Sequence, residues 1–145
     1  MSIKMNPKKY MIIVLAFFIG TGPNVKADFV FGTPENLGPN INSSSADRAP
    51  NISADGLELF FESHRPGGHG SADIYVVRRA SKDDPWEPCM NIGAPVNTAY
   101  WDQVPSISAD GLLLYFSSYD RSGGYGSDDI WVTTRATVSD PWGPP

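Results

Sequence analysis

Two glycine-rich loops hold the side chains of this chain that are best suited to contact a ligand. The first loop carries His64, Arg65 and His69, and the second carries Arg121 and Tyr125. Imidazole, guanidinium and phenol groups hydrogen-bond or stack on ligands, and binding residues gather on loops that a rigid scaffold positions. We therefore predict these five residues as binding candidates. The two histidines and Tyr125 are the stronger candidates, because the chain's internal repeat does not preserve them.

The same loops offer little for catalysis or for a metal ion. His64 and His69 lie five residues apart, without the further ligands and defined geometry that zinc requires. Asp83–Asp84 and Asp128–Asp129 could act in acid–base chemistry or bind calcium, but the spacing of a calcium loop is missing and solvated turns are the better interpretation. The sequence has neither a Gly-x-Ser-x-Gly motif nor a Walker-type phosphate loop. We expect no catalytic residue, no metal and no cofactor.

An internal duplication positions these loops. Residues 36–86 align with residues 91–142 after one residue is inserted near Asp120, and more than half of the aligned positions are identical. Recurrence in both copies favours a structural role over contact with a ligand. The recurring residues to which we assign a structural role are Asp47, Asp55, Gly56, Asp73 and Trp86 in the first copy, and Asp102, Asp110, Gly111, Asp129 and Trp142 in the second.

Each copy predicts a four-stranded antiparallel meander without helices. The Asp-Gly pair in Ser53–Gly56 favours a tight turn, because glycine accepts the positive φ that hairpins need. The strand after this turn alternates in polarity and should bury one face, whereas its more apolar equivalent at 112–118 should be covered on both faces. The strands expected in the first copy are residues 49–53, 57–62, 73–79 and 85–92, the last an outer edge strand because of its two prolines.

Such a meander has two apolar faces and cannot bury both of them alone. Radial stacking of several meanders solves this problem, so we predict an all-β fold of β-propeller blades that form an incomplete propeller. Consecutive strands run in opposite directions, so the 64–72 loop should lie beside the 38–49 segment. The 119–128 loop should lie beside the 93–104 segment in the same way.

The N-terminus has the three regions of a secretory signal peptide. Lysines at positions 4, 8 and 9 precede an apolar run at 10–19, and a Val25–Ala27 cleavage signal follows. The alternative is a membrane anchor, but a run of about ten residues is too short to span a bilayer. We predict cleavage after residue 27, no stable membrane span in the mature chain, and a periplasmic or extracellular location.

Charge and cysteine content limit the partners of the mature chain. Four of the 11 Lys/Arg residues precede Asp28 while all 16 Asp/Glu residues do not, so residues 28–145 carry seven positive and 16 negative charges, a net charge of −9. This acidity argues against binding to nucleic acid or to anionic lipid. Cys89 is the single cysteine, so no internal disulfide can form, and we interpret it as structural.

The repeat resembles a known family. The pattern carried by Asn91–Asn97, Asp102–Leu112 and Ser118–Trp131 resembles the TolB-type, WD-like β-propeller repeat of bacteria. The resemblance implies an exported or periplasmic propeller that binds other proteins, cell-envelope components or carbohydrate-like ligands. It implies no catalytic residue, because the family has no universal one.

The chain departs from the family in its number of blades. We divide the mature part into repeats at about 36–90 and 91–145, with 29–38 as the outer strand of a preceding blade. Propellers close with four to eight blades, so we expect either a fragment of a longer chain or self-assembly of several copies. The leading hypothesis is a non-catalytic binding module. The alternatives are the N-terminal part of a propeller-containing peptidase, lyase or glycosidase, and a purely structural repeat that self-assembles.

Overall fold

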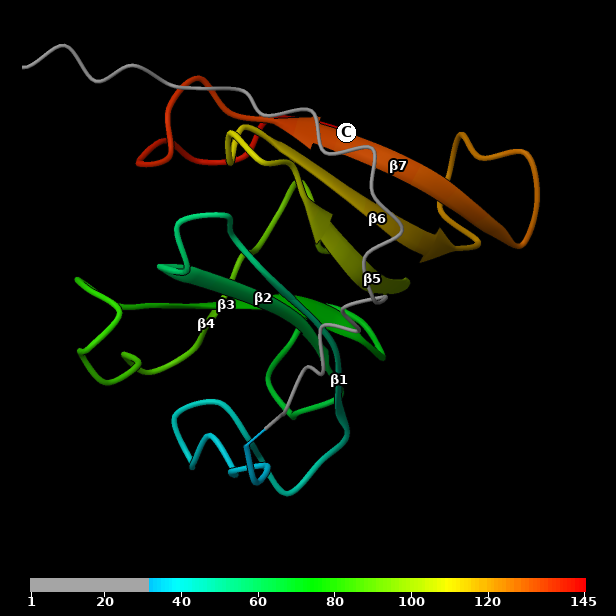
Figure 1. Cartoon of the computed structure of the whole chain (residues 1–145). Helices are drawn as coiled ribbons and strands as arrows, with labels where there is room; N and C mark the ends of the chain where they lie inside the picture. The colour runs from blue at the N-terminus through cyan, green and yellow to red at the C-terminus, as the bar shows by residue number, and fades with distance from the viewer. Residues whose placement is uncertain (1–31) are drawn as a thin grey trace, which may run out of the picture. The chain divides into compact units, whose positions relative to one another are not determined.

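The computed structural model describes residues 32–145, which are all-β and contain no helix (Figure 1). The proposed signal peptide, and the residues up to 31, lie outside this range. Two antiparallel sheets follow the order of the chain, which confirms the all-β, blade-like fold class. The first sheet contains β1 (Asp47–Ile52), β2 (Glu58–Ser63), β3 (Asp73–Arg78) and β4 (Met90–Asn91), and the second contains β5 (Trp101–Ile107), β6 (Leu113–Tyr119) and β7 (Asp128–Thr134).

The two sheets repeat one local geometry. A bulge interrupts β1 between Arg48 and Asn51, and the same bulge interrupts β5 between Gln103 and Ser106. The hairpin turn predicted at the first Asp-Gly pair is present, with Gly56 at a φ of 76° and its N–H donating to the Ser53 carbonyl over 2.9 Å. The second copy of the turn has the same hydrogen bond and a φ of 72° at its glycine.

The outer strands are shorter than the sequence predicted. In the segment expected as the fourth strand of the first sheet, only Met90 and Asn91 pair with β3. Pro85 and Pro88 prevent regular pairing in the residues that precede Met90. The second sheet has three strands instead of the expected four. The segment expected as its fourth strand contacts β7 through one backbone hydrogen bond, from the Gly143 N–H to the Thr134 carbonyl. Residues 32–38, the described part of the strand expected at 29–38, form no strand.

The main core lies between the sheets. Phe60, Ile74 and Val76 of the first sheet pack against Leu114 and Phe116 of the second, and all five are at most 2% exposed. A smaller cluster covers the other face of the first sheet, where the 36–42 segment and the Trp86 region lie over the strands. Its members are Ile41, Leu59, Phe61, Tyr75 and Val77.

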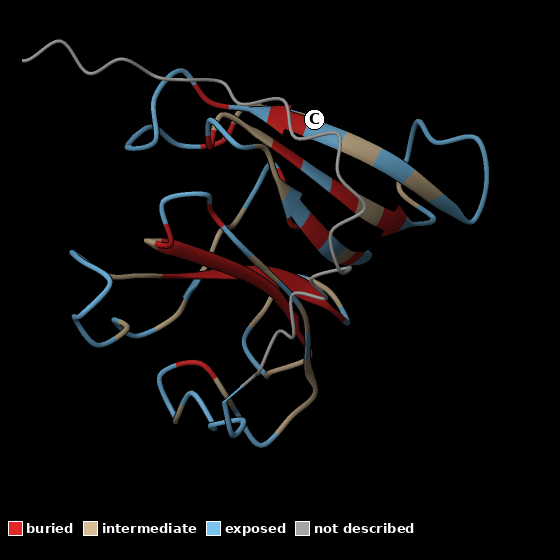
Figure 2. Ribbon diagram, in the orientation of Figure 1, coloured by how far each residue is buried: buried red, intermediate tan, exposed pale blue. Residues whose placement is uncertain are grey.

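The burial of the two second strands is the reverse of the prediction. All six residues of β2 are buried, whereas β6 alternates between buried and exposed residues (Figure 2). The physical reason is the number of neighbours, because β2 is covered on both of its faces and β6 is covered on one by described residues. Tyr115 of β6 lies on the uncovered face and is therefore 44% exposed.

Candidate ligand-binding site

Arg65, a predicted binding residue, is bonded within its own sheet. Its Nη2 donates to Asp47 over 2.7 Å and to the Ile41 carbonyl over 2.6 Å, its Nε donates to Ser63 over 2.8 Å, and it also contacts Cys89. The guanidinium lies over the ring of Tyr75, with its central carbon 4.7 Å from the ring centroid. Only 15% of the Arg65 side chain is exposed, so little of it can reach a ligand.

Arg121 occupies the equivalent place in the second sheet. It donates to the Val96 carbonyl over 2.8 Å and to Asp102 over 3.4 Å, and it lies over the ring of Trp131 at 5.1 Å. Its side chain is 11% exposed. The two arginines thus share three equivalent contacts, with an aspartate, a loop carbonyl and an aromatic ring, which assigns them to the scaffold more than to a ligand.

The aspartates that these arginines contact organise the start of each sheet. Burial opposes the ionisation of Asp47, but hydrogen bonds from Ser63, Ser43 and Arg65 lower its pKa from 3.8 to about 2. Asp102 accepts equivalent bonds from Ser118 over 2.6 Å and from the Thr98 hydroxyl over 2.7 Å. Each carboxylate therefore ties its first strand to its second strand and to the preceding loop.

The other recurring aspartates hold turns. Asp73 accepts the N–H of His69 over 2.8 Å, and Asp129 accepts the N–H of Tyr125 over the same distance. These bonds shape the two glycine-rich loops, whose side chains at His69 and Tyr125 point outward. Tyr125 is fully exposed and His69 is also exposed, so the structure leaves both side chains available for contact with a partner.

The Asp-Gly turns have their own hydrogen bonds. Ser53 Oγ donates to Asp55 over 2.6 Å, and the Leu57 N–H also reaches this carboxylate, so the pKa of Asp55 is lowered. In the second copy, bonds from Ser108 and from the N–H of Leu112 lower the pKa of Asp110 in the same way.

The recurring tryptophans lie at the end of each sheet that is opposite to the glycine-rich loops. Arg79 lies 4.3 Å over the Trp86 ring, and Arg135 lies 4.4 Å over the Trp142 ring. Trp142 also makes an edge contact with Phe60 of the first sheet, with 6.1 Å between the ring centroids. The second tryptophan thus holds the two sheets together, a role that suits a large apolar ring with one polar edge.

The side chains left free for a ligand form a cluster that the sequence reasoning found only in part. His64 meets Trp101 edge to face at 6.2 Å, and Trp101 lies 6.0 Å from Tyr119, its cross-strand partner. Trp101 is 46% exposed and Tyr119 is 42% exposed. We call His64, Trp101 and Tyr119 the aromatic patch.

A charged group borders the aromatic patch. The Glu62 side chain is 5% exposed and lies 3.3 Å from His64 Nε2 and 3.9 Å from Arg48, which is itself 63% exposed. The patch is fixed in place because the Asp102 N–H donates to the Ala72 carbonyl over 3.0 Å and joins the two sheets at this edge. A ligand would therefore meet aromatic faces beside hydrogen-bonding groups on a rigid surface.

One signal in the sequence could have located Trp101. Its position in the first copy is occupied by Ala46, so a large aromatic side chain replaces a methyl group at the loop end of the second sheet. His64 likewise stands where the second copy has Tyr119. The loop analysis named His64 and overlooked its two aromatic neighbours, because they are close in space and far apart in sequence.

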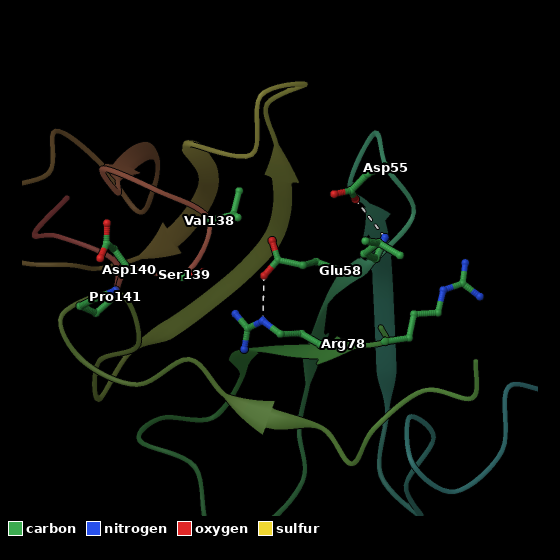
Figure 3. Close-up of a pocket in the computed structure, with 9 residues that line it drawn as sticks. Asp55, Glu58, Arg78, Val138, Ser139, Asp140 and Pro141 are labelled. Atoms are coloured by element: carbon green, nitrogen blue, oxygen red, sulfur yellow. Dashed lines mark hydrogen bonds and ion pairs between the residues drawn. The ribbon is translucent and has the colours of Figure 1, made fainter. Parts of the chain in front are cut away.

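A cleft of about 630 Å³ opens at the opposite end of the sheets (Figure 3). Its wall carries Glu58, which accepts a bond from Arg78 over 2.9 Å and another from the fully buried Arg135 over 2.5 Å. The carboxylate is therefore neutralised by one arginine from each sheet and joins them. The cleft is lined by Asp55, Leu57, Glu58, Arg78, Arg79, Val138, Ser139, Asp140 and Pro141.

The described residues contain no group of three His, Cys, Asp or Glu side chains that could hold a metal ion. Within residues 32–145 no helix is long and apolar enough to cross a bilayer. Comparison with models of protein families finds no match, and comparison with curated proteins finds none either.

Proposed function

We propose that this chain is an exported, non-catalytic module of propeller blades that binds a protein or cell-envelope ligand through the aromatic patch. The observation that carries the proposal is the exposure of Trp101 and Tyr119 beside His64, on a rigid edge of the fold. Tryptophan and tyrosine supply large contact area with a polar handle and at low entropic cost, which is why they dominate the energetics of binding surfaces.

The chemistry of the patch favours a saccharide over a charged polymer. Flat aromatic faces stack on the apolar faces of sugar rings, while Arg48, whose side chain is 63% exposed, can donate hydrogen bonds to hydroxyl groups. The net charge of −9 after residue 27 disfavours anionic partners. A neutral envelope polysaccharide is therefore the ligand class that we propose first, and a protein surface is the second arm of the test.

Co-sedimentation with insoluble chitin, a neutral polysaccharide, tests the saccharide arm, and an array of envelope proteins tests the other. Trp101→Ala should weaken binding by about 30-fold or more, because truncation of a central aromatic anchor costs at least about 2 kcal/mol. Met90→Ala is the control, since it removes an exposed apolar side chain from β4, outside the patch. Equal binding by wild type and Trp101→Ala would refute the assignment of the patch.

The alternative of an enzyme whose catalytic part lies outside this chain stays a prediction. So does the location in the periplasm or outside the cell, which depends on the N-terminal segment. Detection of a mature chain that begins at Asp28 after expression with the native N-terminus would support export. Recovery of the uncleaved chain in the cytoplasm would contradict it.

A further inference from the structure

The interface between the two sheets of one chain supplies a template for contact between chains. On the first sheet it consists of Phe60, Ile74 and Val76, which project together from β2 and β3. On the second sheet these residues meet a surface built around Leu114 and Phe116. Since the two sheets are copies of each other, each of them carries an equivalent of both surfaces.

The equivalents of the three projecting residues are exposed on the second sheet. Tyr115 stands in the place of Phe60, Ile130 in the place of Ile74, and Val132 in the place of Val76. Tyr115 is 44% exposed, Ile130 81% and Val132 40%. We call these three residues the donor face. Exposed apolar side chains that gather on one sheet face indicate a surface for a partner.

The equivalent of the receiving surface lies on the first sheet, where the 36–42 segment covers part of it and leaves a hollow beside β1 and β2. Leu59 and Phe61, the counterparts of Leu114 and Phe116, line a hollow of about 120 Å³. We call this surface the acceptor face. Its lining residues are Leu37, Ile41, Asn42, Asp47, Arg48, Pro50, Leu59 and Phe61.

A side-chain amide adds specificity to the template. Asn97 accepts the N–H of Ile74 over 2.9 Å and donates to its carbonyl over 2.8 Å, so it pairs with the backbone of β3 next to the two residues of β3 that pair with β4. The counterpart of Asn97 is Asn42, which belongs to the acceptor face. The counterpart of Ile74 is Ile130, on β7, which is the edge strand of the second sheet and offers backbone groups for pairing.

We propose that the donor face of one chain docks on the acceptor face of a second copy of the same chain. Each chain then repeats between molecules the contact that it already makes between its own sheets, and Asn42 of one copy pairs with the backbone of Ile130 in the next. Such a head-to-tail contact is heterologous and closes into a ring when its rotation permits. With two sheets in residues 32–145 of each chain and four to eight blades in a propeller, we expect about two to four copies.

The contact between copies should be weaker than its template. In the template, Glu58 and Arg135 form a buried ion pair across the interface. Leu113 stands in the place of Glu58 on the donor side, and Arg79 in the place of Arg135 on the acceptor side. The ion pair is therefore lost, and the assembly should depend on concentration.

Sedimentation velocity of the mature chain, residues 28–145, over a range of concentrations tests the proposal. We expect a shift from the monomer to a species of about two to four copies. Ile130→Glu should abolish the shift by placing a charge on the donor face, and Leu37→Glu should do the same on the acceptor face. Both side chains are more than half exposed, so the variants should keep the unfolding midpoint of the wild type. Tyr125→Glu is the control and should assemble normally.

Mixing the two variants distinguishes this geometry from a symmetric dimer. The Ile130→Glu chain keeps its acceptor face and the Leu37→Glu chain keeps its donor face, so an equimolar mixture should form a one-to-one dimer and nothing larger. Neither variant alone should form it. A wild type that stays monomeric at every concentration, or an oligomer that Ile130→Glu leaves intact, would overturn the proposal.

Discussion

The carboxylate of Asp47 should make the stability of the first sheet depend on pH in a specific way. It accepts hydrogen bonds from Ser63 over 2.6 Å, from the N–H of Ser43 over 2.6 Å and from Arg65 over 2.7 Å. Despite burial, which raises the pKa, these bonds lower it from 3.8 to about 2. The difference corresponds to about 2 kcal/mol of folding free energy, and solvent screening reduces it to about 1–2 kcal/mol.

The sign of the effect follows from the lowered pKa of Asp47. Because the unfolded carboxyl titrates near 3.8 and the folded one near 2, its contribution to stability is complete above the unfolded value. The contribution is lost as the pH falls from there toward about 2. The assay is urea unfolding, followed by tryptophan fluorescence between neutral pH and about pH 2, for the wild type and for Asp47→Asn. The loss of unfolding free energy in the variant should shrink by about 1–2 kcal/mol over this range.

The matched control for Asp47 is Asp83→Asn, which changes an exposed carboxylate in a loop. Its unfolding free energy should stay within about 0.5 kcal/mol of the wild type at neutral pH. A destabilisation by Asp47→Asn that is the same at neutral pH and near pH 2 would refute the reasoning. It would show that the amide disturbs packing while the charge of the carboxylate contributes nothing.

Two further predictions use the repeat to supply matched pairs. Gly70→Ala should destabilise the chain by about 1–3 kcal/mol, because an added Cβ would overlap the Tyr100 carbonyl oxygen. Its counterpart Gly126→Ala should be nearly neutral, because a Cβ at Gly126 meets no atom within 4 Å. Urea unfolding distinguishes the two variants, and equal effects would contradict the close approach of the 64–72 loop to the Tyr100 backbone. Phe60→Ala should lower the free energy of unfolding by about 3–5 kcal/mol, while Tyr115→Ala, at the exposed counterpart position, should lower it by less than about 1 kcal/mol in the monomer. Thermal unfolding measures both losses. A larger loss for Tyr115→Ala would contradict the exposure of this position in the second sheet.

The features that the sequence predicted well are local to one repeat. The Asp-Gly turns, the succession of short strands joined by turns, and the all-β character follow from nearby residues. The structure of residues 32–145 agrees with all three predictions. The extent of the outer strands was overestimated, because the predicted range contained the prolines that interrupt pairing. Proline marks an edge strand but does not say how many residues pair beside it.

Burial was predicted poorly because it depends on what lies beside each sheet. The composition of 112–118 suggested a strand covered on both faces, yet the more polar β2 is the buried one. Glu58 and Glu62 tolerate burial in β2 because arginines and a histidine lie next to them, and such partners are not adjacent in sequence. The aromatic patch was missed in part for the same reason, since Trp101 meets His64 only after the sheets pack together.

Comparison of the two copies separates residues that serve one sheet from residues that serve its surroundings. The ion pair of Asp47 with Arg65 recurs as that of Asp102 with Arg121. Each pair lies within one repeat, so it does not depend on what packs against that sheet. The copies differ at two places where their surroundings differ: at the ion pair across the sheets, where Leu113 replaces Glu58, and in the aromatic patch. If substitution of Asp47 and Asp102 destabilised their two sheets alike, while substitution at the exposed divergent positions Trp101 and Tyr115 affected binding or assembly alone, the repeat itself would identify the functional residues of the chain.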